Sequence, residues 1–157
     1  MRCLLPFYCM KWFVLAFSLL LAACGAKPES LDDVSAQRVT LPGGQQIQVE
    51  TVMKQKDMMS GMQYRDAMAP GRGMLFVHAR AGRYTYWTHL VRVPLDIIWL
   101  DREKRIVEIS PNTPPCTAKD AVGCPMYGGH AVARFVLELN GGLAERYGLK
   151  VGQQLSF

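Results

Sequence analysis

The sequence is poor in the local motifs that mark enzyme active sites. Its 157 residues include only three histidines, and no serine lies in the Gly-x-Ser-x-Gly turn of a hydrolase nucleophile. The five cysteines form no Cys-x-x-Cys pair, which argues against the common zinc-ligand and thiol-redox patterns. Internal repeats and low-complexity tracts are absent too. The sequence therefore predicts the location, the membrane anchor and the fold of the protein better than it predicts a catalysed reaction.

Positive charge is present only in modest excess and is not clustered. The chain has 18 Lys and Arg residues against 13 Asp and Glu, which gives a formal net charge of +5. Nucleic-acid-binding domains concentrate basic residues on one face, whereas here they are scattered, at Arg65, Arg72, Arg80, Arg83, Arg92 and Arg102 among other positions. We therefore predict no nucleic-acid partner.

The apolar run near the N-terminus is too short to span a bilayer. It extends from Trp12 to Ala23, whereas a membrane-spanning helix needs about 20 residues. Small residues precede a cysteine in Leu21-Ala22-Ala23-Cys24, as at the cleavage sites of exported lipoproteins. We predict that residues 1–23 are a lipoprotein signal peptide and that Cys24 is the lipidation site. A retained signal anchor beginning near Cys3 is the alternative, and Met10 is a second candidate for the start of translation.

The chain from Cys24 onward has two parts with different compositions, a short tether followed by a globular domain. Residues 24–37 are mostly polar and contain Pro28, as flexible linkers do. Residues 38–157 are long enough for one globular domain. Cleavage removes two basic residues and no acid, so the formal charge of +5 falls to +3. We predict a protein of the cell envelope, anchored to the membrane by its lipid and facing the periplasm. Gly25 stands where an aspartate retains lipoproteins at the inner membrane of Gram-negative cells, which favours the outer membrane.

Short apolar or alternating segments, separated by turn residues, follow one another through the domain. They predict strands at residues 37–41, 46–51, 73–78, 95–100, 106–109, 134–139 and 154–157. Two short helices are expected at residues 54–59 and 142–147, each ended by a nearby glycine. We predict an α+β fold: a small β-rich domain with a rolled antiparallel sheet or open barrel and two short helices.

Five motifs in a fixed order carry a resemblance to a known family. They are Gly61-Met62-Gln63-Tyr64-Arg65, Gly73-Met74-Leu75-Phe76, Trp87 followed by Pro94-Leu95-Asp96-Ile97-Ile98, Cys124-Pro125-Met126-Tyr127, and Val136-Leu137-Glu138-Leu139-Asn140-Gly141-Gly142. The series resembles the domain-of-unknown-function family numbered one hundred and ninety-two, the uncharacterised ACR family, from about Val39 to Phe157. The resemblance implies a small β-rich domain, often exported, with no established reaction.

The chain departs from the pattern of that family in two places. Where the family usually has Met-Lys-Asn-Thr after the tryptophan, this chain has Thr88-His89-Leu90-Val91. Where the family usually has Gly-Asp near the C-terminus, this chain has Gly152-Gln153. A polar pair and an acidic side chain are therefore replaced, and any binding role they have in relatives is altered here.

Two cysteines remain in the domain, Cys116 and Cys124, in a loop rich in proline and glycine. An even pair in an oxidising compartment favours a structural disulfide, which would stabilise the fold by about 2–3 kcal/mol in the chain-entropy model. A metal site formed with His130 and His89, or a redox-active dithiol, is the alternative. We predict the disulfide and no bound metal.

Aromatic and polar residues cluster between positions 84 and 127. Tyr84, Tyr86, Trp87, His89 and Tyr127 would form a shallow cleft for a sugar ring or another flat ligand, with Asp96, Arg92 or Arg65 orienting it. The competing interpretation, which strand alternation favours, turns Trp87 away from Tyr84 and Tyr86. The ligand-binding candidates are therefore Arg65, Tyr86, Trp87, His89, Asp96 and Tyr127.

Two acidic residues lie within predicted strands. Asp96 shares a strand face with Ile98 and Leu100, so we expect it to be partly buried and to need a partner. Glu138 alternates with Leu137 and Leu139, so we expect it to point outward into solvent.

Two functions of different class follow from these residues. The preferred one is non-catalytic binding of a small ligand, for example a carbohydrate, or of an envelope protein partner, without a cofactor. The alternative is an envelope enzyme, metal-assisted, that uses His89, His130 and Asp96 or the Cys116/Cys124 pair.

Overall fold

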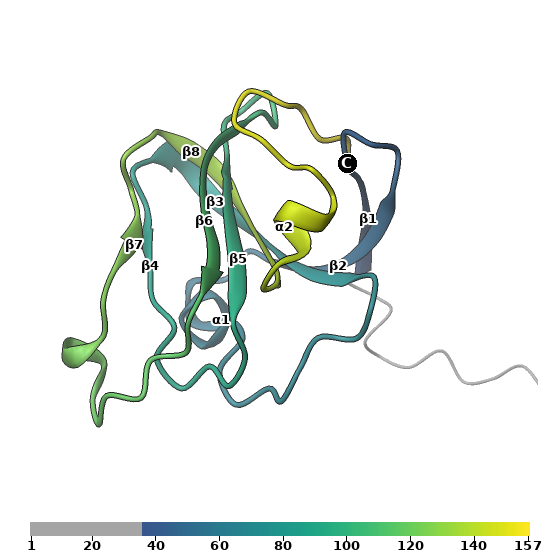
Figure 1. Cartoon of the computed structure of the whole chain (residues 1–157). Helices are drawn as coiled ribbons and strands as arrows, with labels where there is room; N and C mark the ends of the chain where they lie inside the picture. The colour runs from purple at the N-terminus through teal and green to yellow at the C-terminus, as the bar shows by residue number, and fades with distance from the viewer. Residues whose placement is uncertain (1–35) are drawn as a thin grey trace, which may run out of the picture. The chain divides into compact units, whose positions relative to one another are not determined.

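The computed structural model describes residues 36–157 (Figure 1). The predicted signal peptide at residues 1–23, the lipidation site Cys24 and nearly all of the tether at residues 24–37 lie outside these residues. The described elements are β1 (Ala36–Thr40), β2 (Gln46–Val52), α1 (Gln55–Ser60), β3 (Arg72–Gly82), β4 (Thr85–Tyr86), β5 (Leu95–Leu100), β6 (Ile106–Thr113), the 3₁₀ helix η2 (Ala121–Gly123), β7 (Tyr127–Gly128), β8 (Ala133–Asn140) and α2 (Leu143–Arg146). No helix in this part of the chain is long and apolar enough to cross a membrane.

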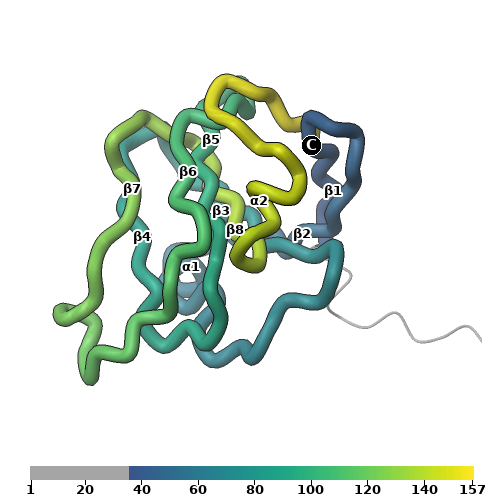
Figure 2. Tube along the Cα trace, in the orientation of Figure 1, coloured from purple at the N-terminus to yellow at the C-terminus, as the bar shows by residue number. Residues whose placement is uncertain are grey.

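Six strands form one sheet in the order β1-β2-β3-β8-β5-β6, and β4 pairs with β7 in a separate two-stranded ribbon. Among the strand pairs of residues 36–157, only β2–β3 is parallel, and a long connection that contains α1 separates these two strands. The fold is thus the predicted α+β type with two short helices, and its sheet is mixed and not closed into a barrel within residues 36–157. Figure 2 traces the same path and shows the C-terminal segment beside β1.

Both faces of this sheet are covered. Alternate residues of the central strands, such as Leu75 and Leu137, enter one apolar cluster that also includes Ala144 of α2. Their neighbours Met74 and Val136 enter a second cluster, against which Met58 of α1 packs. The two helices therefore cover opposite faces of the sheet, as Figure 1 shows.

Asp96 of β5 is fully buried below α2. One of its oxygens, Oδ1, accepts hydrogen bonds from the backbone N–H groups of Asn112 (2.6 Å) and Gly142 (3.1 Å). The other, Oδ2, accepts one from the N–H of Ala144 (2.5 Å). The burial that the sequence predicted is confirmed, and the partners of Asp96 are backbone groups at the start of α2 and in β6.

The two-stranded ribbon is held against the second cluster by Trp99 of β5. Its indole Nε1 donates a hydrogen bond to the carbonyl of Tyr84 (2.8 Å). Gly128 of β7 has a positive φ of 74°, and a Cβ placed there would lie 2.1 Å from the indole ring. Only glycine allows the backbone of β7 to approach Trp99 this closely.

The predicted disulfide is confirmed between Cys116 and Cys124, whose Cα atoms are 5.7 Å apart. Two other predictions are wrong. Residues 154–157 form no strand, only single bridges at Ser156 and Gln154. Glu138 is 4% exposed rather than solvated, because the face of β8 that it occupies is covered as well.

Candidate ligand-binding cavity

A cavity of about 490 Å³ lies beside the second apolar cluster, within the size range of small-molecule sites. It is bounded by α1 and the turn after it, by β3, by β4 and the segment that follows, and by one residue of β8. Its lining consists of Met53, Gln55, Met58, Met59, Ser60, Gly61, Met62, Gln63, Phe76, His78, Ala79, Tyr84, Thr85, Tyr86, Trp87, His89, Val91, Met126 and Glu138.

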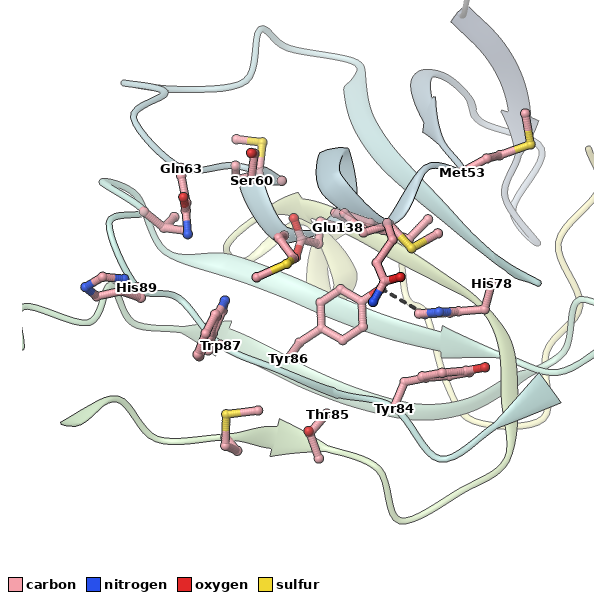
Figure 3. Close-up of a pocket in the computed structure, with 18 of the residues that line it drawn as sticks. Met53, Ser60, Gln63, His78, Tyr84, Thr85, Tyr86, Trp87, His89 and Glu138 are labelled. Carbon is pink, nitrogen blue, oxygen red and sulfur yellow. Dashed lines mark hydrogen bonds between the residues drawn. The ribbon is translucent and has the colours of Figure 1, made fainter. Parts of the chain in front are cut away.

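Aromatic rings form one side of the cavity. Figure 3 shows Tyr84, Tyr86 and Trp87 in succession along this side, with Ser60 and Gln63 across from them. The Tyr86 ring packs edge-on against Phe76, with their centroids 5.2 Å apart. A rigid aromatic surface of this kind suits a ring-shaped ligand.

Methionines supply much of the remaining lining. Met58 and Met62 are wholly or partly buried, whereas Met53, Met59 and Met126 are 53–69% exposed. Methionine side chains are flexible and polarisable, so they adapt to ligands of different outline. This part of the lining is therefore apolar and adjustable.

Glu138 is the only acidic residue that the described part of the chain contributes to the lining. It stands in register with Met74 of β3 and Ile97 of β5, in a row of otherwise apolar side chains. Its Oε2 is buried and has no hydrogen-bond partner among residues 36–157. Burial raises the pKa of this carboxyl to about 8, against a smaller lowering by the charge of Arg65. At neutral pH the group is mostly protonated.

Two histidines lie at opposite ends of the cavity in Figure 3. The Nε2 of His89 is buried without a hydrogen-bond partner. The Nε2 of His78 lies 3.0 Å from the hydroxyl of Tyr86, and its ring is stacked on Tyr84. Burial, followed by the charge of Arg134, lowers the pKa of His78 to about 4, so its ring is neutral where it hydrogen-bonds to the Tyr86 hydroxyl. Burial, then Glu138 and Tyr84, raises the pKa of Tyr86, so its hydroxyl keeps its proton.

The segment that carries His89 is fixed by its neighbour Thr88, which is fully buried. The Thr88 hydroxyl donates to the carbonyl of Pro114 (2.8 Å), and the Thr88 carbonyl accepts from the N–H of Cys116 (3.1 Å). The disulfide loop is thereby joined to the wall of the cavity.

The structure brings together three of the six predicted ligand-binding residues: Tyr86, Trp87 and His89. The interpretation that turned Trp87 away from Tyr84 and Tyr86 is wrong, because β4 ends at Tyr86 and all three line the same cavity.

The other three predicted residues lie outside the lining. Tyr127 pairs with Tyr86 in the ribbon and packs against the second cluster. Asp96 is bound to backbone groups below α2. Arg65 forms a two-pronged pair with Glu50, at 2.7 and 3.1 Å. Arg92, the further candidate, pairs with Asp66.

The residues of the predicted enzyme alternative are dispersed. The side chain of His130 is 86% exposed and pairs through Nδ1 with Glu108. His89 lies in the cavity, Asp96 lies on the other side of the sheet, and the two cysteines are bonded to each other. Among residues 36–157, no three His, Cys, Asp or Glu side chains are grouped so that they could hold a metal ion.

The family described as uncharacterised ACR (DUF192) matches residues 38–157. The chain belongs to this family. A comparison with the curated proteins gives no match.

Two solved structures share the fold. A protein of unknown function from Novosphingobium aromaticivorans is 26% identical, with a TM-score of 0.70 over 78% of this chain and 85% of that chain. A proposed transcription regulator from Sinorhizobium meliloti is also 26% identical, with a TM-score of 0.66 over 76% of this chain and 89% of that chain.

The methionine lining and the place of Glu138 in it were not predicted from the sequence. One signal for Glu138 was available: residues 95–100 form an apolar run broken only by Asp96, which is typical of a strand covered on both faces. β8 pairs with this strand and so lies in the covered part of the sheet, but the pairing itself is not visible in the sequence.

Proposed function

We propose that this domain is a non-catalytic binding module that holds a small ring-shaped ligand in the cavity. The observation that carries the proposal is the presence of two buried, unpartnered polar atoms, Glu138 Oε2 and His89 Nε2, in a largely apolar lining. Native proteins leave few such atoms without a partner, because each costs about 1–3 kcal/mol. Neighbouring side chains shield both atoms from solvent, so a ligand recovers this free energy when the lining adjusts and lets its polar groups hydrogen-bond to them.

The lining favours a ligand with an apolar or aromatic body and a few polar groups. Tyr86 and Trp87 offer ring surfaces, and the methionines offer an adaptable apolar boundary. A carbohydrate, which the sequence suggested, would stack on the same rings and belongs in the same test. Binding is preferred to catalysis because His130 and Asp96 lie away from His89 and each is already engaged.

We also propose that the domain is displayed in the cell envelope, tethered through a lipid on Cys24. The supporting features are the Leu21-Ala22-Ala23-Cys24 motif and the Cys116–Cys124 disulfide, a bond typical of oxidising compartments. Orientation toward the periplasm, and the outer membrane as the site of anchoring, follow from the same prediction.

The test is a thermal-shift screen of the full chain, purified in detergent, against sugars and small aromatic amines, alcohols and acids. A ligand present at about 100 times its Kd adds about 2.7 kcal/mol to the free energy of unfolding, which raises the Tm by several degrees in a domain of this size. We expect hits among ring compounds, and at least tenfold weaker binding in Trp87→Ala.

Tyr64→Ala is the matched control. Tyr64 is an exposed aromatic residue outside the lining, so its loss should leave the affinity unchanged. The proposal fails if no compound raises the Tm, or if Trp87→Ala binds every hit as well as the unmodified chain does.

A further inference from the structure

The electrostatic character of the cavity is one-sided. Among residues 36–157, Glu138 is the only acidic side chain of the lining, and no lysine or arginine of this range is present in it. The nearby cation that acts on Glu138 is Arg65, but its guanidinium is held by Glu50 through two hydrogen bonds. No fixed positive charge in the lining therefore neutralises a carboxylate at this position.

The aromatic side of the cavity also suits a cation. Tyr86 and Trp87 present ring surfaces, whose negative faces attract an ammonium or guanidinium group. A buried carboxylate beside aromatic rings combines an ion pair with cation–π attraction, both strengthened by exclusion of water. His89 Nε2 adds a second buried polar atom that lacks a partner in the same lining.

We propose that the ligand carries a positively charged amine on a ring-shaped body, with the amine bound to Glu138 and the ring against Tyr86 and Trp87. This rests on the proposed binding function and assigns its ligand class. An anionic ligand is disfavoured by Glu138, and a neutral ligand would use the carboxyl group only as a hydrogen-bond partner.

Proton release accompanies this mode of binding. Burial holds the carboxyl of Glu138 largely protonated at pH 7, since its pKa is raised to about 8. An ammonium group brought to the carboxyl group of Glu138 stabilises the carboxylate form, so the proton of Glu138 passes to the buffer while the ligand keeps its own proton. The other titratable groups in the lining are Tyr84, Tyr86, His78 and His89. A neutral ligand requires no such release.

The experiment uses three compounds with the same ring and different head groups: tyramine (ammonium), tyrosol (hydroxyl) and 4-hydroxyphenylacetate (carboxylate). Titration calorimetry on the full chain in detergent, in two buffers of different ionisation enthalpy, gives the Kd and the number of protons released. We expect tyramine to bind at least tenfold more tightly than tyrosol and to release a measurable fraction of one proton. We expect 4-hydroxyphenylacetate to bind most weakly.

Glu138→Gln retains the size of the side chain and removes the charge. It should weaken tyramine binding at least tenfold, abolish proton release and change tyrosol binding by less than about threefold. Tyrosol binding in this variant also reports that its cavity is intact. Glu145→Gln, at an exposed position of α2, is the control that should change neither affinity.

Several outcomes would overturn the amine assignment. They are tyrosol binding as tightly as tyramine, tyramine affinity unaffected by Glu138→Gln, and no binding of tyramine at all. If the wider screen still finds neutral ring compounds that depend on Trp87, the binding function stands and only the ligand class is wrong. If that screen is silent as well, both proposals fail.

Discussion

Two buried carboxyl groups lie on neighbouring strands of this sheet and face opposite sides of it. Asp96 of β5 accepts hydrogen bonds from three backbone N–H groups. Glu138 of β8 has a buried oxygen with no partner and lines a cavity. Both residues are almost completely inaccessible, at 0% and 4% exposure. Burial alone therefore does not tell a structural carboxylate from one that is available to a ligand.

The difference lies in what the surrounding chain provides. Around Asp96 the turn into α2 and the end of β6 supply backbone donors, so its oxygens are hydrogen-bonded within the fold. Around Glu138 the neighbours in register are Met74 and Ile97, which have nothing to donate. The first arrangement stabilises α2, and the second leaves interaction free energy available to a bound molecule.

The largest effect is expected from Asp96→Ala. This change leaves three backbone N–H groups in and around α2 without their acceptor and creates a cavity below the helix, so the free energy of unfolding should fall by about 3 kcal/mol or more. Urea unfolding followed by tryptophan fluorescence measures the loss. Glu138→Gln, measured in the same way at pH 6, should cost less than about 1 kcal/mol. If the two variants are equally destabilised, the distinction between the two carboxylates is wrong.

Much of the fold could be predicted from the sequence because its cues are local. Pro42-Gly43-Gly44 marks the turn between β1 and β2, and the charged residues 101–105 mark the turn between β5 and β6. The C-terminal strand was predicted wrongly, since residues 154–157 have a strand-like pattern but make only isolated bridges. Pairing depends on the neighbouring chain and not on the pattern of the segment itself.

Only the part of the candidate site that is local in sequence could be predicted. Tyr86, Trp87 and His89 are close in sequence, so their grouping is visible before the fold is known. Alternation correctly placed Glu138 on the face opposite Leu137, but whether that face meets solvent depends on α1 and the ribbon, which are distant in sequence. Asp96 was correctly expected to be buried, but its backbone partners were not foreseen, because they depend on where α2 packs.

An intermediate effect is expected from loss of the disulfide, which ties down the loop leading into β7. Cys116→Ser and Cys124→Ser should each lower the free energy of unfolding by about 2–3 kcal/mol, and the double variant should be no less stable than either single one. Because β7 pairs with β4, the loss should loosen the side of the sheet that holds Glu138 more than the side that holds Asp96. Hydrogen exchange of the amides of Tyr86 and Ala144 compares the two sides. Equal acceleration at both amides would contradict this coupling.

A smaller effect is expected in the pH dependence of the free energy of unfolding. The titration of Glu138 reports on its side of the sheet alone. The carboxyl of Glu138 has a pKa of about 8 in the folded protein against 4.5 as its ordinary value. Its stabilising contribution is complete below pH 4.5 and is lost as the pH rises toward 8, because the unfolded chain gives up a proton that the folded chain retains. Glutamine does not titrate, so the Glu138→Gln variant does not lose stability in this way. At pH 8.5 its free energy of unfolding should exceed that of the unmodified chain by about 1–3 kcal/mol. A difference that does not vary between pH 5 and pH 8.5 would show that Glu138 is ionised in the folded protein.

The smallest effect belongs to His78, whose titration has the opposite sign. Its pKa is lowered from 6.5 to about 4, so the unfolded chain takes up a proton that the folded chain refuses, and stability falls as the pH drops from 6.5 toward 4. Because the ring is only half-buried, solvent screening limits this contribution to about 1 kcal/mol. Glu138 opposes it between pH 4.5 and 6.5, so the measurement is made in the Glu138→Gln background. There, adding His78→Gln, whose amide can still hydrogen-bond to the Tyr86 hydroxyl, should flatten the acid limb of the stability curve and leave the alkaline limb unchanged. An acid limb equally steep with and without His78 would assign the loss to another group.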